Sequence, residues 1–226
     1  MTRFSLLLLG LVGACGQVES APDAAQIDAP AIDAPACQPR QLLVGGQAPE
    51  PQGWSIVMSG PATLSQGPDY TRIVTTTASG QSSGGQLLLT YPGVIEPATP
   101  FALSFVVLVE AVATHNYLDA AAAIMASYSG GFGDGTDRAE MLYLDAAGVG
   151  WADDTGAVAF DVRNNAYHTY RVDSDGAGTV RVSIDGMMVL TRPGFITNGA
   201  IAIGDQTNDA QLDATLRIRS IAQLCP

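Results

Sequence analysis

The sequence predicts an all-β protein, and three observations on residues 37–226 indicate it. Apolar residues recur with a period of two rather than 3.6, as in strands that bury one face. Gly, Asp, Asn and Pro separate these runs at intervals of about ten residues. Short strands with this spacing are typical of antiparallel β-sandwiches and barrels, and we expect an antiparallel β-sandwich.

The predicted strands follow one another from the first third of the chain to its end. They occupy residues 71–77, 86–91, 101–112, 141–145, 150–152, 157–162, 166–172, 179–184, 187–190, 200–203 and 214–221. Asp185 and Gly186 join two of them, and both residue types tolerate the positive φ of a tight hairpin turn. We therefore expect a hairpin at this point.

Residues 119–126 are the one segment with helical composition. Four consecutive alanines favour a helix, but so short a helix cannot stand alone. A strand precedes the segment and Gly130 and Gly131 follow it. We expect a buried strand with small side chains.

The composition limits the partners that this chain can bind. The hydrophobic fraction of 47% is ample for one core, and the net charge is −12 with no lysine among the ten basic residues. Such an acidic chain has no basic stripe to neutralise phosphates, so we expect no nucleic acid as a partner. Calcium or neutral polysaccharides suit this charge better than anionic polysaccharides, and solubility alone is the simplest explanation.

The first residues resemble an export signal. After a weakly basic start, residues 4–12 are mainly apolar, and two small residues then precede Cys15. The stretch is too short to cross a bilayer as a helix, so we expect residues 1–14 to be a signal peptide. The ending resembles the lipobox of bacterial lipoproteins, which implies lipidation of Cys15. The resemblance implies an exported protein anchored in a membrane, at the outer membrane or the cell surface.

Residues 15–36 are expected to form a disordered tether between this anchor and the domain. The segment is rich in Asp, Ala and Pro, with Asp23, Asp28 and Asp33 five residues apart. Proline removes backbone donors and the aspartates repel one another, so no core can form here. A single β-sandwich domain is expected over residues 37–226.

Two cysteines remain if Cys15 is lipidated. Cys37 lies at the start of the domain and Cys225 is the penultimate residue. An exported chain folds in an oxidising compartment, where an even pair of cysteines forms a bridge. We expect a Cys37–Cys225 disulfide, which requires the two ends of the domain to lie side by side.

Residues 167–190 carry a pattern of strand, polar turn, strand, Asp-Gly and strand. This pattern resembles the late hairpins of laminin-G-like and concanavalin A-like jelly rolls, and residues 199–221 resemble the strands that follow. Trp54 resembles the aromatic residue near their first strand and is expected in the core. The lipobox with its Asp-Ala-Pro tether also resembles surface lipoproteins of myxobacteria-like organisms. The resemblance implies a jelly-roll β-sandwich and leaves the function open, because this fold carries lectins, lyases, hydrolases and adhesion modules.

Catalytic patterns are weak. The acidic strand motif of glycoside hydrolases on this fold is absent, since none of the four glutamates in residues 37–226 is followed by an acid two residues later. Residues 80–84 match the string of a serine nucleophile elbow, but a strand follows where a helix is needed, so a Gly/Ser loop is favoured. His115, Tyr117 and His168 offer the bases that a polysaccharide lyase uses, although the shortage of arginine disfavours a uronate-binding groove.

Candidate binding residues cluster in the middle of the chain. Trp151, followed by Asp153 and Asp154, is the best candidate for an aromatic sugar platform, with Tyr128 and Tyr143 beside it; the alternative places Trp151 in the core. Asp134 and Asp137 form the favoured calcium loop, and residues 205–209 and 153–154 are further candidates. Turn formation alone also explains these acidic loops.

Three functions are compatible with these observations. The favoured hypothesis is a lipid-anchored, non-catalytic surface module that binds carbohydrate or another extracellular ligand, with calcium as a possible cofactor. An atypical polysaccharide lyase or glycoside hydrolase and a structural surface or assembly protein are the alternatives.

Overall fold

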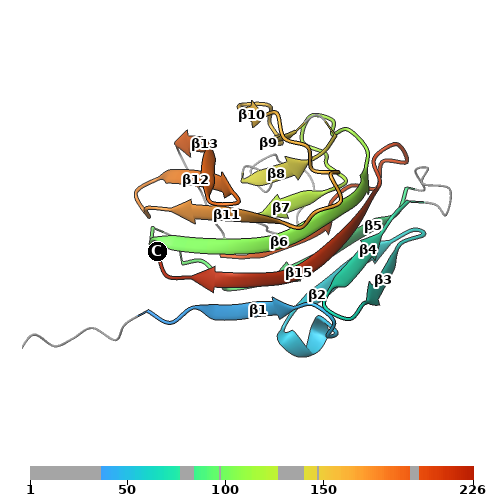
Figure 1. The fold of residues 1–226 in the computed structure, drawn as a ribbon, viewed down its shortest axis with the longest axis horizontal. Helices are drawn as coiled ribbons and strands as arrows, with labels where there is room; N and C mark the ends of the chain where they lie inside the picture. Colours follow the sequence, from blue (N-terminus) through green and yellow to red (C-terminus); the bar gives the residue numbers. More distant parts are fainter. Residues whose placement is uncertain (1–36, 77–83, 97, 127–139, 147, 194–198) are drawn as a thin grey trace, which may run out of the picture. The chain divides into compact units, whose positions relative to one another are not determined.

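The computed structural model describes residues 37–76, 84–96, 98–126, 140–146, 148–193 and 199–226. Within these residues the chain forms two antiparallel β-sheets and a short 3-10 helix, Glu50–Gln52 (η1), as Figure 1 shows. The predicted all-β sandwich is confirmed. Cys37–Pro226 form one compact unit, and none of the described helices is long and apolar enough to cross a membrane.

The larger sheet has eight described strands. Its order is β13 (Met187–Pro193), β12 (Thr179–Ile184), β11 (His168–Ser174), β6 (Phe101–Val112), β15 (Ala214–Leu224), β4 (Thr71–Val74) and β3 (Thr63–Gln66), and β1 (Arg40–Val44) also pairs with β15. The long strands β6 and β15 lie side by side in the middle of this sheet (Figure 1).

The smaller sheet has seven described strands. Its order is β10 (Ala157–Val158), β9 (Val149–Trp151), β8 (Met141–Leu144), β7 (Ala123–Met125), β14 (Ile201–Asp205), β5 (Gln86–Tyr91) and β2 (Ser55–Ser59). Consecutive strands β7, β8, β9 and β10 pair in chain order, which local hairpin connections allow.

The core lies between the sheets, as the period-two pattern predicts. In β11, Tyr170 and Val172 are buried, whereas the alternate residues Thr169 and Arg171 are partly exposed. The inward residues of both sheets form one buried apolar cluster that includes Phe105 of β6. Burying each such side chain contributes about 1.5–3 kcal/mol before the entropy cost of ordering it.

Most local predictions of strands and turns are confirmed, but of the strand predicted over 157–162 only Ala157–Val158 form one. Asp185 and Gly186 have φ values of 50° and 84° and connect β12 to β13 in the expected hairpin. The alanine-rich segment forms strand β7 rather than a helix, with every residue from Ala120 to Ala126 buried. The short strands β1 and β3 were not among the predicted strands, because few of their residues are buried and alternation is weak.

Cys37 and Cys225 form the predicted disulfide, with 5.6 Å between their Cα atoms. Strand β1 pairs with the end of β15, with Arg40 opposite Gln223, and this pairing brings the two cysteines together. The bridge closes a sequence separation of 188 residues. A loop of this size corresponds to about 5 kcal/mol in the chain-entropy description of disulfides.

Candidate functional site

The outward face of the larger sheet carries a network of charged side chains at its centre. Arg72 of β4 and Arg217 of β15 are directly paired in the sheet, and both form ion pairs with Glu110 of β6. Arg72 Nε donates to Glu110 Oε2 at 3.0 Å. Burial raises the pKa of Glu110, but the hydrogen bond from Arg72 and the charges of both arginines outweigh burial and hold the pKa below its ordinary value. Glu110 is therefore ionised at neutral pH.

Two tyrosines of this face are covered by arginines. The guanidinium carbon of Arg217 lies 4.6 Å from the centre of the Tyr70 ring, and that of Arg219 lies 3.8 Å from the Tyr167 ring. Arg219 Nε also bonds Asp69 at 3.0 Å. These stacks hold the guanidinium groups in place through cation–π attraction.

The same face continues across β11 and β12. Arg171 Nε bonds Asp173 at 3.0 Å, and Arg181 lies between Asp173 and Asp175, at 3.9 and 3.5 Å. Alternation explains the arrangement, because Val172, Val180 and Val182 point into the core and leave these charged residues outward. Arginine side chains thus extend over most of the width of the sheet.

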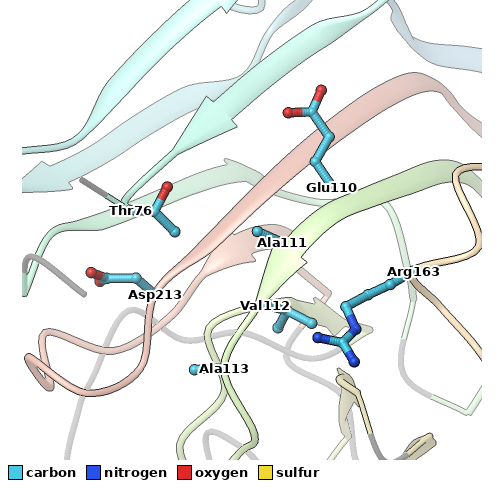
Figure 2. Close-up of a pocket in the computed structure, with 7 residues that line it drawn as sticks. All are labelled: Thr76, Glu110, Ala111, Val112, Ala113, Arg163 and Asp213. Carbon is cyan, nitrogen blue, oxygen red and sulfur yellow. The ribbon is translucent and has the colours of Figure 1, made fainter. Parts of the chain in front are cut away.

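A hollow of about 250 Å³ opens at one end of this face, where β6 ends and β15 begins. Its lining comprises Thr76, Glu110, Ala111, Val112, Ala113, Arg163 and Asp213. Figure 2 shows the Arg163 side chain entering from the loop before β11, on the side of the hollow away from Thr76 and Asp213. Arg163 is exposed, and its guanidinium forms no ion pair with any described residue.

A buried carboxyl, Asp205 of β14, is linked to this end of the sheet. Its Oδ2 atom lies 2.5 Å from Thr75 Oγ1, and its Oδ1 atom accepts the Thr207 N–H at 3.2 Å. Thr75 Oγ1 also accepts the Ala214 N–H at 2.9 Å. Burial, together with a smaller contribution from the negative charge of Asp213, raises the pKa of Asp205 to about 8 against the two hydrogen bonds. Asp205 is therefore mainly protonated at neutral pH. Its neighbour Asp213 lines the hollow.

A second hollow, of about 340 Å³, lies at the other end of β6 and β15. Its lining comprises Arg40, Gly93, Val94, Glu96, Thr99, Pro100, Phe101 and Gln223. The Arg40 guanidinium carbon is 5.9 Å from the centre of the Tyr91 ring. Arg40 forms no ion pair with another residue in the described part of the chain. This hollow therefore also contains an arginine whose charge is not paired with a described carboxylate, although Glu96 lines the same hollow.

The expected aromatic platform is not formed by the described residues. Trp151 is 2% exposed and belongs to the core cluster, which confirms the core alternative and corrects the proposal of a sugar platform. The Arg192 guanidinium carbon lies 5.3 Å from the centre of its ring, and Arg192 bonds Asp153 at 2.6 Å. Tyr143 is 5% exposed, so its ring is equally closed to a sugar.

His115 holds Asp154 and Tyr143 in a closed cluster. Its Nδ1 atom lies 2.5 Å from Asp145 Oδ2, its Nε2 atom lies 3.1 Å from Asp154 Oδ1, and its ring stacks on Tyr143 at 3.5 Å. Both ring nitrogens are thus occupied by carboxylates. The sequence contained no signal for this cluster, because its members are 30 and 39 residues apart.

His168 is occupied in the same way at the other side of the fold. Its Nδ1 atom lies 2.7 Å from Asp185 Oδ2 and its Nε2 atom 3.0 Å from Asn164 Oδ1. Tyr117 is 65% exposed. Neither histidine nor Tyr117 lines either of the two hollows, so neither of these hollows is the cleft that the lyase hypothesis requires.

The remaining predicted site residues are outside the described residues or serve other contacts. Cys15, Tyr128, Asp134 and Asp137 lie outside the described ranges, as do residues 80–83 of the Gly/Ser string. No three His, Cys, Asp or Glu side chains of the described part are grouped so that they could hold a metal ion. In the alternative acidic loop, Asp209 bonds the Asn116 side chain and the Gln211 N–H.

Comparison with solved structures supports the fold. A carbohydrate esterase of the Shiga toxin-encoding bacteriophage phi24B is 20% identical, with a TM-score of 0.51 over 82% of this chain and 98% of that chain. The binding domain of botulinum neurotoxin serotype C1 is 14% identical with a TM-score of 0.47, and another structure of botulinum neurotoxin type C is 13% identical with the same score. Both of these matches include 82% of this chain, but they include only 48% and 47% of the respective toxin chains. No protein-family model and no curated protein matches the sequence.

Proposed function

We propose that this protein is a glycan-binding β-sandwich module that binds its ligand on the outward face of the larger sheet. One observation carries the proposal: this face ends in a hollow of about 250 Å³ lined by Thr76, Glu110, Arg163 and Asp213 together with alanine and valine side chains. Saccharides present many hydroxyl groups, which such donors and acceptors can bind. The volume is sufficient for a sugar unit rather than a large ligand.

The fold supports this choice of ligand without fixing it. A β-sandwich of the concanavalin A-like kind, proposed from residues 167–221, presents one broad sheet face that a chain of sugars can follow. The carbohydrate esterase of bacteriophage phi24B acts, by its name, on carbohydrates. Saccharides are therefore the first probes to test, and a non-catalytic role is proposed because His115 and His168 have both ring nitrogens occupied.

The test is a glycan array probed with the full-length protein and a pair of alanine variants. Ala111 lines the hollow, so Ala111→Trp fills it, whereas Ala177 is exposed in the turn before β12 and Ala177→Trp serves as the matched control. We expect the wild type and the control to bind the same glycans and Ala111→Trp to lose them. A folded wild type that binds no glycan, or undiminished binding by folded Ala111→Trp, would refute the proposal.

We further propose that the module is displayed on a bacterial membrane through lipid attached to Cys15. The support is the apolar run of residues 4–12, the small residues before Cys15 and the Asp-Ala-Pro segment that precedes the compact unit at Cys37. Replacing Cys15 by serine is expected to release the protein from the membrane fraction. Unchanged fractionation of Cys15→Ser would rule out this anchor.

A further inference from the structure

The outward face of the larger sheet gathers most of the described arginines of an acidic chain. The chain has a net charge of −12, and its described arginines are eight of the ten basic residues. Six of them lie on the outward face of the larger sheet or at its hollow: Arg72, Arg163, Arg171, Arg181, Arg217 and Arg219. The fold therefore concentrates on one face the positive charge that the sequence disperses over 150 residues.

Ion pairs neutralise most of this charge but leave Arg163. Glu110 pairs with Arg72 and Arg217, and Asp69 pairs with Arg219. On β11 and β12, Asp173 pairs with Arg171 and Asp175 pairs with Arg181. Asp213 adds one more carboxylate at the hollow. With Asp161, whose Oδ1 atom accepts the Arg163 N–H at 3.1 Å, six guanidinium groups meet six carboxylates. Arg163 is nevertheless the arginine of this set whose guanidinium forms no ion pair within the described residues.

The hollow recognises its ligand by polar contacts rather than by stacking. No aromatic residue is among the residues that line it. The two tyrosines near the centre of the face, Tyr70 and Tyr167, have arginines over their rings. A neutral sugar commonly stacks its apolar face on an open aromatic ring, and an arginine already occupies one face of each of these rings. A guanidinium instead makes charge-assisted, bidentate bonds to a planar or tetrahedral anion.

We propose that the hollow at Arg163 binds the anionic substituent, carboxylate or sulfate, of an acidic saccharide. This inference rests on the proposed glycan-binding function and narrows it to a chemical class. Arg163 supplies the charge, Thr76 supplies a hydroxyl group, and the pairing of Glu110 with two arginines offsets its repulsion of the anion. The rest of the protein is acidic and repels anions, so an anionic saccharide is expected to bind at this face rather than elsewhere.

The test is calorimetric titration of the full-length protein with three matched oligosaccharides. An oligogalacturonate carries carboxylates, a sulfated galacto-oligosaccharide carries sulfates, and a neutral galacto-oligosaccharide of the same length carries neither. We expect binding of one or both anionic probes, with affinity that falls as salt is added, and binding of the neutral probe at least about tenfold weaker. The stronger anionic probe identifies the substituent.

Two arginine variants separate the hollow from general charge. Arg163→Gln should lower the affinity for the preferred anionic probe about tenfold or more, whereas Arg40→Gln, at the hollow on the opposite end of β6, should leave it unchanged. Both side chains are free of ion pairs with described residues, so neither change leaves a carboxylate unpaired there. Arg163→Lys should recover only part of the affinity, because an ammonium group cannot form the bidentate contact.

The outcomes that contradict the anionic class of ligand differ from those that contradict glycan binding itself. Equal binding of neutral and anionic probes, or an unchanged affinity in Arg163→Gln, refutes the anionic class; if Ala111→Trp still abolishes binding, the glycan-binding function stands. Binding of no saccharide on the array or in the titrations refutes both.

Discussion

The buried carboxyl of Asp205 provides a quantitative test of the fold around the hollow. We consider Asp205→Asn, which replaces a protonated carboxyl by an amide of the same shape. The protonated carboxyl can donate to Thr75 Oγ1, which frees the Thr75 hydroxyl proton for the Ala214 carbonyl at 3.1 Å. The asparagine amide can donate in the same direction while its oxygen accepts the Thr207 N–H. The variant should therefore fold.

The sign of the pH effect follows from the direction of the pKa shift. The pKa of Asp205 rises from 3.8 to about 8 on folding, so the folded state holds a proton that the unfolded state releases. The stability that this proton contributes is complete below pH 3.8 and is lost as the pH rises through about 8. Each pH unit in this window costs about 1.4 kcal/mol, so the loss between pH 5 and pH 8 is about 4 kcal/mol.

The assay is urea unfolding of the wild type and Asp205→Asn across this pH window. The free energy of unfolding of the wild type should fall relative to the variant by about 4 kcal/mol between pH 5 and pH 8. Asp175→Asn is a control that should show no pH dependence relative to the wild type in this window, since hydrogen bonds from Ala177 and Thr179 lower the pKa of Asp175 from 3.8 and its contribution is lost only below that pH. Parallel stability curves for the wild type and Asp205→Asn would refute a buried, protonated carboxyl.

Three other changes test the packing. Reduction of Cys37–Cys225 should lower the free energy of unfolding by up to about 5 kcal/mol, measured by denaturant unfolding with and without reductant; an unchanged midpoint would contradict a stabilising bridge. Trp151→Ala should cost about 3–5 kcal/mol in the same assay, because the ring is buried, and a cost near zero would contradict its core position. Asp185→Ala removes the carboxylate that bonds both His168 and the Thr169 N–H, at a positive φ that alanine adopts poorly, and should destabilise the domain by about 1–2 kcal/mol or more; thermal unfolding that does not change would contradict a stabilising role of this turn residue.

Local rules predicted the strands and turns of this fold. The alternation in β11 and β12 and the Asp185-Gly186 hairpin depend on residues near one another in sequence. The disulfide follows from the number of cysteines, because two remain once Cys15 is set aside. The orientation of Trp151 could not be predicted in this way. Every residue of β8 and β9 is buried, so alternation no longer indicates which face of the sheet a side chain occupies.

The charged face could not be predicted because strand order is not a local property. Arg72 and Glu110 are 38 residues apart in sequence, and Arg217 joins them only because β15 pairs with both β4 and β6. A count of ten basic residues in an acidic chain therefore indicated a shortage of arginine. Once the sheet is formed, those few arginines gather on one face, and the candidate ligand changes from a neutral to an acidic saccharide.

The most direct measurement is a crystal structure of the full-length protein with the oligosaccharide that binds best. We expect the saccharide on the outward face of the larger sheet, with its anionic group bonded to the Arg163 guanidinium in the hollow at the end of β6. A saccharide bound instead on the smaller sheet, or at the cluster around His115, would contradict the central claim.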